Sequence, residues 1–222
     1  MFKTETHLHT SESSGCARLS AEEMVKSYYE EGYSTICICD HLKEDHLIHW
    51  GNISWQEKVN NHLKGYEKAK ETALKYNINI LLASEIEFKK TAPNHYLLIG
   101  VTKEFLLSNP DICEMSIEEF AILAKKNNIF VVQAHPFRDS RCFPTSEFVD
   151  AIEVYNSNPR HSDFNEKSFE LVEKYDLCIT AGSDAHRAED IARSGILTET
   201  EIKTSDDLIE AIKERKIRII GV

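Results

Sequence analysis

The chain has 222 residues, of which 41% are hydrophobic and 28% are charged, and its formal net charge is -11 at pH 7. This length and apolar content are sufficient for one folded domain, which we expect to span residues 1–222. The negative charge argues against binding to a long nucleic acid or an anionic membrane surface, because their phosphate groups repel it. An anionic substrate therefore requires a locally positive pocket.

Targeting signals and disulfide patterns are missing from the sequence. No apolar run approaches the roughly 20 residues that cross a bilayer, and the N-terminal segment lacks the charged-then-apolar order of a secretory signal. We therefore expect a cytoplasmic location. The six cysteines include no Cys-x-x-Cys pair, so we expect reduced thiols and no structural zinc site. Cys37 and Cys39 lie in an apolar run, whereas Cys16 lies in a polar loop, where a thiol could be functional.

Apolar strands alternate with amphipathic helices along the whole sequence. The apolar runs predict strands over residues 4–10, 35–39, 78–83, 95–101, 129–134, 151–155, 178–182, 195–197 and 217–220. Helical spacing and capping residues predict helices over residues 20–32, 54–76, 116–127, 165–175 and 205–214. The polar stretch between residues 41 and 54 is long enough to be a lid. This alternation indicates a parallel sheet with helices outside, which can close into a barrel.

Metal-binding residue types recur where the predicted strands end. In the first strand, His7 and His9 share one face because alternate side chains point the same way, and two neighbouring imidazoles are half of a metal site. The later positions of this kind are Asp40, His41, Glu85, His135, Asp184 and His186, and His95 begins a strand. A barrel gathers the carboxyl ends of its strands at one mouth, so this set has more ligands than one ion needs. We therefore expect two or three ions bridged by a carboxylate, which indicates hydrolytic chemistry.

Each of these residues also has a structural interpretation. Asp40 could cap the turn after its strand, and His135 could pack in the core. Glu87 shares a face with Glu85, so the sequence does not separate a ligand from its neighbour. Glu153 lies near a strand end and could support a ligand or be structural.

The chain resembles the polymerase and histidinol phosphatase (PHP) superfamily of metal-dependent phosphoesterases in motifs that cover nearly its whole length. The motifs are, in order, His7-x-His9, Asp40-His41, Glu85, His95, His135 and Asp184-x-His186, and the segments 152–156 and 182–186 are also similar to that family. The resemblance implies a distorted (β/α) barrel of TIM-like type with about seven strands. It also implies a cofactor of two or three divalent ions, which can be zinc, manganese or iron.

The resemblance further implies a role for each matching residue. The first ion would be bound by His7, His9, Glu85 and Asp184, the second by Glu85, His95 and His135, and the third by His41 and His186. The catalytic residues would be His7, His9, Glu85, Asp184 and His186, and Asp40 and Glu153 would support the ligands from behind. The family often supplies one more ligand shortly after its His-x-His motif, and Glu12 or Cys16 could take that place here.

Together these features predict an enzyme that hydrolyses a small phosphomonoester, or a short nucleotide phosphodiester, by attack of a metal-bridging hydroxide. Arg18, Arg138 and Arg160 lie in loops expected near the mouth and could bind phosphate oxygens, or could serve only solubility. We expect a small phosphorylated substrate, no long nucleic acid and no membrane as partners, and the sequence does not indicate an oligomeric state. Two other functions fit the same ligands: an amidohydrolase that acts on a carbon centre, and a regulatory module that holds metal without turnover.

Overall fold

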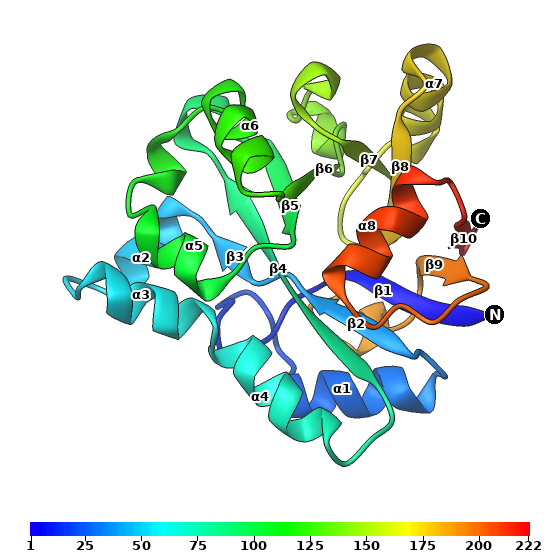
Figure 1. Ribbon diagram of the computed structural model, residues 1–222, viewed down its shortest axis with the longest axis horizontal. Helices are drawn as coiled ribbons and strands as arrows, with labels where there is room; N and C mark the ends of the chain where they lie inside the picture. The colour runs from blue at the N-terminus through cyan, green and yellow to red at the C-terminus, as the bar shows by residue number, and fades with distance from the viewer.

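We describe the protein from a computed structural model of residues 1–222, in which ten strands form one curved sheet (Figure 1). The strands are β1 (Phe2–Leu8), β2 (Thr35–Ile38), β3 (His41–Leu42), β4 (Asn79–Glu87), β5 (His95–Ile99), β6 (Phe130–Ala134), β7 (Ala151–Asn156), β8 (Cys178–Gly182), β9 (Gly195–Thr198) and β10 (Arg218–Ile220). They lie in the order β10-β9-β1-β2-β4-β5-β6-β7-β8, and β3 pairs with β4 beside this path.

The sheet closes into a distorted barrel between β1 and the segment after β8. Leu8 forms a parallel bridge with Ala185, and the N–H of His9 donates to the carbonyl of Ala185 at 3.0 Å. The ring consists of the seven strands β1, β2, β4, β5, β6, β7 and β8. The predicted fold class is therefore confirmed, although β3, β9 and β10 bring the total to ten strands.

Strand β5 departs from the parallel arrangement that the sequence predicts. It pairs antiparallel with both β4 and β6, so that Glu87 lies opposite His95 and Ile99 lies opposite Phe130. The cause is the short link of residues 88–94, because parallel neighbours need a connection of a dozen or more residues. The start of β5 therefore lies at the same mouth as the ends of the parallel strands, and His95 lies there.

Eight α-helices connect the strands and lie outside the barrel (Figure 1). They are α1 (Ala21–Glu30), α2 (Glu44–His49), α3 (Trp55–His62), α4 (Lys64–Ala73), α5 (Lys103–Ser108), α6 (Ile117–Lys126), α7 (Asn165–Tyr175) and α8 (Ser205–Lys213). One-turn 3-10 helices span Lys89–Thr91, Ile112–Glu114, Arg138–Ser140, Ser146–Phe148 and Ala188–Asp190. The capping boxes predicted at Ser20 and Ser116 are present. None of these helices has the length and apolar character that a membrane span requires.

The long helix predicted over residues 54–76 is two helices, α3 and α4, with a break at Leu63. The cause is Ser13, in the loop after β1. Its hydroxyl donates to the carbonyl of Asn61 at 3.0 Å and accepts the N–H of Gly65 at 3.0 Å. It thereby replaces the hydrogen bond that a continuous helix would form between these two residues. This contact joins the loop after β1 to the outer helices.

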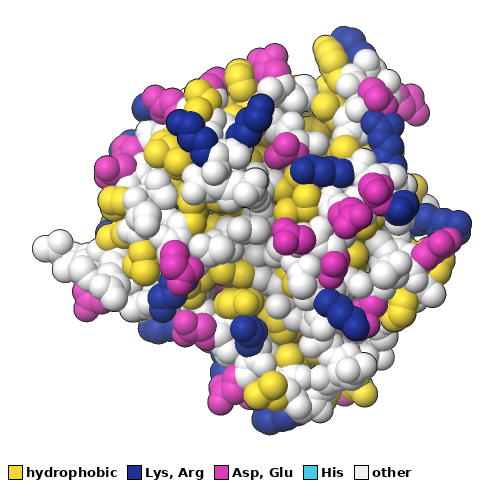
Figure 2. All heavy atoms as spheres, in the orientation of Figure 1, with side chains coloured by type: hydrophobic (Ala, Val, Ile, Leu, Met, Phe, Trp, Pro, Cys, Tyr) yellow, Lys and Arg dark blue, Asp and Glu magenta, His cyan; other side chains and the backbone are white.

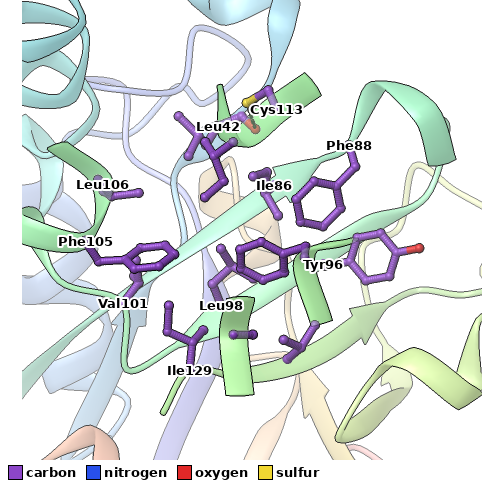
Figure 3. Close-up of a cluster of buried hydrophobic side chains, with 14 of the residues drawn as sticks. Leu42, Ile86, Phe88, Tyr96, Leu98, Val101, Phe105, Leu106, Cys113 and Ile129 are labelled. Atoms are coloured by element: carbon purple, nitrogen blue, oxygen red, sulfur yellow. Dashed lines mark hydrogen bonds between the residues drawn. The ribbon is translucent and has the colours of Figure 1, made fainter. Parts of the chain in front are cut away.

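A cluster of buried hydrophobic side chains packs α5 and α6 against β4 and β5 (Figure 3). Within it, the ring centroids of Phe88 and Tyr96 lie 5.4 Å apart. Alternate side chains of a strand point to opposite faces, so burial of Ile86 in this cluster turns Glu85 into the barrel. The same alternation in β5 turns His95 inward while Tyr96 packs outward. The hydrophobic cluster therefore sets the direction of two side chains at the mouth.

The surface carries charged side chains of both signs. Figure 2 shows acidic and basic side chains interspersed over one face, with small hydrophobic patches between them. Exposed ion pairs include Lys90 with Glu119 at 2.8 Å and Arg215 with Asp176 at 2.7 Å. Such pairs contribute little to stability, so the fold depends mainly on its buried interior. All six cysteines are free, as the sequence predicts.

Candidate metal centre

The predicted ligands converge on the carboxylate of Glu85, which is buried on β4 and 2% exposed. Its two oxygens lie 2.7 Å from His41 Nδ1, 2.9 Å from His95 Nδ1, 3.0 Å from His135 Nε2, 3.4 Å from His9 Nε2 and 3.6 Å from His7 Nε2. The histidines belong to β1, β3 and β5 or directly follow β1 and β6. One carboxylate thus faces imidazoles from several sides of the barrel mouth.

Asp184, in the segment after β8, lies next to the same imidazoles. Its Oδ1 is 3.2 Å from His9 Nε2, 3.5 Å from His7 Nε2 and 3.4 Å from His186 Nδ1. The ligand atoms form three groups, in each of which all atoms lie within 4.8 Å of one another. These groups are His7, His9 and Glu85; Glu85, His95 and His135; and His9, His41 and His186. Glu85 belongs to two groups, as a bridging carboxylate would.

Two of these residues have a backbone conformation that residues other than glycine rarely adopt. The angle φ is +30° at His135 and +49° at Asp184. A non-glycine residue in this region costs about 1–3 kcal/mol, and such residues cluster at functional sites. Hydrogen bonds hold both: the N–H of His135 donates to Glu153 at 3.0 Å, and Asn158 Nδ2 donates to the carbonyl of Asp184 at 3.1 Å.

Burial lowers the pKa of some imidazoles of the centre, whereas the carboxylates beside them raise the pKa of His7, and that of His95 to about 9, against the effect of burial. Burial lowers the pKa of His9 to about 3 and that of His135 to about 4, so both rings keep a free lone pair at neutral pH. Burial acts to raise the pKa of Glu85, but the surrounding imidazoles hold this pKa well below 4.5. The charges of His7 and Arg138 likewise hold the pKa of Asp184 well below 3.8, against the effect of burial. The lone pairs of neutral imidazoles and the negative charge of the carboxylates are the groups that bind a divalent cation.

Glu153 on β7 orients the ring of His7. Glu153 Oε1 lies 2.8 Å from His7 Nδ1, which leaves His7 Nε2 toward Glu85 and Asp184. The other oxygen of Glu153 accepts the N–H of His135 at 3.0 Å. Burial acts to lower the pKa of His7, but the carboxylates around the ring raise it well above 6.5. Contacts of this kind fix the ring orientation of metal-binding histidines.

Contacts with the protein also orient the rings of His186 and His95. His186 Nδ1 donates to the backbone carbonyl of Asp184 at 2.9 Å, which leaves Nε2 free. His95 Nδ1 faces Glu85, and its Nε2 lies 3.3 Å from Glu87 Oε2. Glu87 therefore contacts a predicted ligand from the outer side, whereas Glu85 lies at the centre.

Three residues that the sequence analysis considers for the site lie beside the ligands around Glu85 and Asp184, and not among them. Asp40 accepts hydrogen bonds from the N–H of Thr10 at 2.7 Å, its hydroxyl at 2.6 Å and the Ser14 hydroxyl at 2.7 Å, so it braces the loop after β1. Glu12 accepts the first backbone N–H of α1 at 2.9 Å, so its carboxylate is engaged at that helix start. Cys16 is exposed and lines the cavity at the mouth.

The cavity over the centre, of about 520 Å³, has an excess of basic side chains. Its basic residues are Lys43, Arg138, Arg141, Arg160 and Arg187, and its acidic residues are Glu87 and Asp184. This balance is local, because the chain as a whole has 37 acidic and 26 basic residues. Arg160 is paired with Asp190, with Nη2 at 2.7 Å from its Oδ2. Arg18 is exposed and does not line this cavity.

Sequence analysis does not single out the cavity cations Lys43, Arg141 and Arg187. Lys43 comes two residues after His41, and Arg187 directly follows His186. This adjacency is a signal that could have identified Lys43 and Arg187, because the segments after barrel strands line the mouth.

Seven buried polar atoms of the centre make no hydrogen bond of good geometry, although two of them, His41 Nδ1 and Glu85 Oε2, lie 2.7 Å apart. The seven atoms are His7 Nε2, His9 Nδ1 and Nε2, His41 Nδ1, Glu85 Oε2, His135 Nδ1 and Asp184 Oδ1. Buried polar groups are nearly always paired, and each unpaired one costs about 1–3 kcal/mol. Zinc, manganese and iron bind imidazole nitrogens and carboxylate oxygens, so the residues present fit divalent ions.

Sequence comparison matches part of the chain to one family and to one further protein. The family described as PHP-associated (PHP_C) matches residues 163–217. An uncharacterized protein of Methanocaldococcus jannaschii is 38% identical over 63 residues, which are 28% of this chain and 27% of that protein.

Solved structures of the same fold cover almost the whole chain. A two-domain protein from Bacteroides vulgatus, which contains a predicted PHP-like metal-dependent phosphoesterase, matches 98% of this chain with a TM-score of 0.71 and 18% identity. The lesion-specific endonuclease PfuEndoQ from Pyrococcus furiosus matches 98% of this chain with a TM-score of 0.65 and 16% identity. This chain spans 64% of the first protein and 57% of the second. At these identities the likeness establishes the fold.

The chain therefore has the fold of the PHP-like metal-dependent hydrolases. The resemblance to the PHP superfamily that the sequence predicts is confirmed by this fold and by the match of the PHP-associated family.

The expectation that excludes a long nucleic acid as a partner is wrong. Endonuclease Q, in complex with a 27-mer duplex substrate with an abasic lesion at the active site, matches 96% of this chain with a TM-score of 0.63 and 13% identity, and this chain spans 56% of it. The expectation rested on the net charge of -11, which does not describe the basic excess at the mouth. A substrate responds mainly to the charges within about 10 Å of its phosphates, because salt screens the more distant ones.

Proposed function

We propose that this chain is a metal-dependent phosphoesterase whose reaction takes place at the mouth of the barrel. The observation that carries the proposal is the set of seven buried atoms around Glu85 and Asp184 that make no hydrogen bond of good geometry. These atoms match the coordination chemistry of divalent ions and not a hydrogen-bonded core. We assign metal binding to His7, His9, Glu85 and Asp184 for one ion, to Glu85, His95 and His135 for a second, and to His41 and His186 for a third.

Ions bound there would supply an activated water and would withdraw charge from the phosphate oxygens. In this proposal the chain binds and orients the reacting groups and supplies no covalent nucleophile. The two thiols that line the cavity support this, because desolvation raises the pKa of Cys16 and that of Cys142 each to about 11 and keeps both protonated at neutral pH. Glu153 would hold His7 in its orientation through the 2.8 Å contact with Nδ1.

The basic rim supports an anionic substrate. Lys43, Arg141 and Arg187 line the cavity, and the Arg141 and Arg187 side chains are 73% and 42% exposed, with their nearest carboxylates at 3.6 Å and 3.9 Å. Guanidinium groups with this freedom can bind phosphate oxygens in pairs. Both a phosphomonoester and a phosphodiester of a nucleic acid are compatible with such a rim.

Metal content and hydrolysis measured on one preparation test the proposal. We expect zinc, manganese or iron in the purified protein by elemental analysis. The same preparation should cleave at least one phosphate ester among p-nitrophenyl phosphate, bis(p-nitrophenyl) phosphate, a single-stranded oligonucleotide and a duplex containing an abasic site. His9→Ala should lose metal and activity, because His9 belongs to two of the three ligand groups.

The matched control is His49→Ala, which removes an exposed imidazole of α2 and should retain both properties. Bound metal without cleavage of any phosphate ester would contradict the proposal and favour a metal-holding module. Cleavage of p-nitrophenyl acetate or a lactone, with no cleavage of phosphate esters, would instead favour amidohydrolase chemistry.

A further inference from the structure

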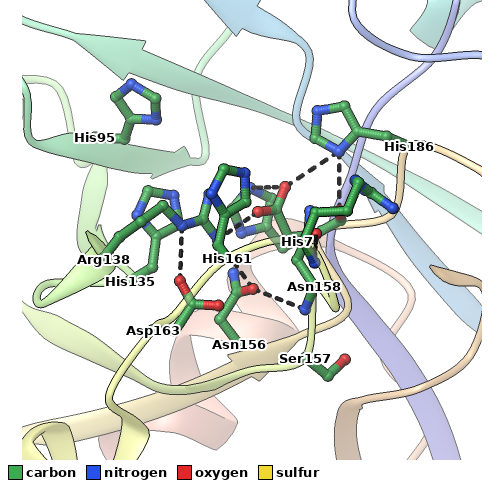
Figure 4. Close-up of polar contacts among 12 residues, drawn as sticks. His7, His95, His135, Arg138, Asn156, Ser157, Asn158, His161, Asp163 and His186 are labelled. Carbon is green, nitrogen blue, oxygen red and sulfur yellow. Dashed lines mark hydrogen bonds and ion pairs between the residues drawn. The ribbon is translucent and has the colours of Figure 1, made fainter.

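Arg138 lies against the centre with most of its guanidinium already engaged by the protein. Its Nε donates to Asp163 Oδ1 at 2.7 Å, and its Nη2 donates to Asp184 Oδ2 at 2.7 Å and to Asn156 Oδ1 at 3.0 Å (Figure 4). The Arg138 side chain is 12% exposed, and that of Asp163 is 3% exposed. An arginine held in this way is a fixed part of the site, unlike the more exposed Arg141 and Arg187 that line the cavity.

The two oxygens of Asp184 have different surroundings. Oδ2 is held by Arg138, whereas Oδ1 is buried without a hydrogen-bond partner and lies 3.2 Å from His9 Nε2. A carboxylate with one oxygen held by a charged donor cannot turn freely, so Oδ1 stays directed at the imidazoles. The backbone of Asp184, with φ of +49°, is not part of the regular strand, so the strand does not fix this side chain.

We propose that Arg138 is a positioning residue that fixes the orientation of Asp184 for metal binding. Asp163 and Asn156 hold the guanidinium from behind, and Asn156 in turn donates to Glu153 at 2.8 Å. One continuous hydrogen-bonded chain therefore connects Asp163 to two acidic side chains of the centre, one of which orients His7. The proposal rests on the proposed function only in that the centre binds divalent ions.

The competing role of Arg138 is direct binding of a phosphate. The guanidinium lines the cavity, and its Nη1 has no hydrogen bond within the protein. A phosphate-binding arginine would change substrate and phosphate affinity but not metal affinity. A positioning arginine would change metal affinity even when no substrate is present.

Zinc affinity, measured by competition with a chromogenic chelator, separates these roles without any need for turnover. We expect Arg138→Lys to weaken Zn²⁺ binding by about 10- to 100-fold, the range typical of residues that support metal ligands. Asp163→Asn should weaken it by a smaller factor, because Asp163 contacts only the arginine and not the centre. The matched control is Arg215→Lys, which changes an exposed arginine paired with Asp176 at 2.7 Å and should leave Zn²⁺ affinity unchanged.

Steady-state kinetics at saturating metal give a second readout. A positioning role predicts a lower kcat with little change in KM, and an unchanged inhibition constant for inorganic phosphate. Unchanged Zn²⁺ affinity in both Arg138→Lys and Asp163→Asn, or a rise in KM and in the phosphate inhibition constant alone, would overturn the proposal. If circular dichroism shows that Arg138→Lys does not fold, the Zn²⁺ affinity of Asp163→Asn decides between the two roles of Arg138. Failure of the wild-type protein to bind any of Zn²⁺, Mn²⁺ and Fe²⁺ would overturn the proposed function as well.

Discussion

Two buried carboxylates at the mouth, Asp40 and Glu85, are each 2% exposed but have different partners. Asp40 accepts hydrogen bonds from Thr10 and Ser14 at 2.7, 2.6 and 2.7 Å. Glu85 is surrounded by imidazoles, and its Oε2 makes no hydrogen bond of good geometry, although His41 Nδ1 lies 2.7 Å away. The two residues are nevertheless neighbours, because the N–H of Glu85 donates to the carbonyl of Asp40 at 3.1 Å.

The difference separates a structural carboxylate from a ligand. Amide and hydroxyl donors satisfy Asp40 within the protein, so its burial stabilises the loop after β1. Several imidazoles crowd around Glu85, and a divalent cation between them would bind their lone pairs and the carboxylate together. Substitution of Asp40 should therefore alter stability, and substitution of Glu85 should alter metal binding.

The largest effect is expected from Glu85→Gln. Loss of the bridging charge should reduce hydrolysis by roughly 1000-fold and reduce bound metal, because the two groups that share Glu85 lose their common ligand. Elemental analysis and steady-state rates measure both quantities. Asp40→Asn is the paired variant, and we expect it to lower the melting temperature while metal content is retained. Equal loss of metal in the two variants would remove the distinction between these carboxylates.

Removal of metal should lower the stability of the whole fold. An ion at roughly 1000 times its Kd stabilises the folded state by about 4 kcal/mol, which for a chain of this size is about 10 °C in Tm. A chelator should therefore lower Tm by about this amount, and added Zn²⁺ should restore it. Differential scanning calorimetry with and without chelator gives the shift, and a Tm that does not respond to metal would argue against an ion-filled centre.

Gly65→Ala tests the close packing of α4 against Asp40 and Thr10. A Cβ at Gly65 would lie 2.5 Å from Asp40 Oδ2 and against the Thr10 hydroxyl. The added methyl group should push these side chains apart and destabilise the fold by about 2 kcal/mol. Urea unfolding measures this loss, and Gly15→Ala is the control because a Cβ there meets nothing within 4 Å. Similar stabilities for the two variants would contradict the close approach.

A pH-dependent effect of similar size concerns His62, which is buried beside the strand that carries Glu85 and lies 2.8 Å from Ser84 Oγ. Burial lowers the pKa of His62 from 6.5 to about 4. The unfolded chain binds this proton below pH 6.5, whereas the folded chain does so only near pH 4, so this contribution to stability is lost as pH falls between these values. From pH 7 to pH 5 the loss should be about 2 kcal/mol.

His62→Gln removes this titrating group and should reduce the dependence of stability on pH. Urea unfolding of metal-free protein at pH 7 and pH 5 measures the difference between wild type and variant, which cancels the effects of the other histidines. An equal loss of stability in both proteins would mean that His62 is not the source.

Local patterns predict most strands and capped helices, but not β3, α2 or α5, and they predict the positions at which metal-binding residue types lie. His7 and His9 share a face because strand geometry requires it, and Glu85 faces inward because Ile86 is apolar and packs outward. These features depend on near neighbours in the sequence, so a single sequence is enough to predict them.

The features that the sequence does not predict depend on distant partners. The loop residue Ser13 breaks the predicted long helix by contacts with residues 48 and 52 positions away. Glu12 follows the His-x-His motif, but its carboxylate meets the free N–H at the start of α1. The basic rim depends on which loops meet at the mouth, and net charge, summed over the whole chain, conceals it.

The antiparallel β5 has a consequence for how the centre can change. Because β4 and β5 form one hairpin, the pairing of Glu87 with His95 fixes where the backbone of His95 lies relative to that of Glu85. A one-residue insertion or deletion in that register would exchange inward and outward faces and remove His95 from the mouth. Length variation in the hairpin link of residues 88–94 is thus tolerable only when it preserves strand register, whereas loops that follow the parallel strands are free of this restriction.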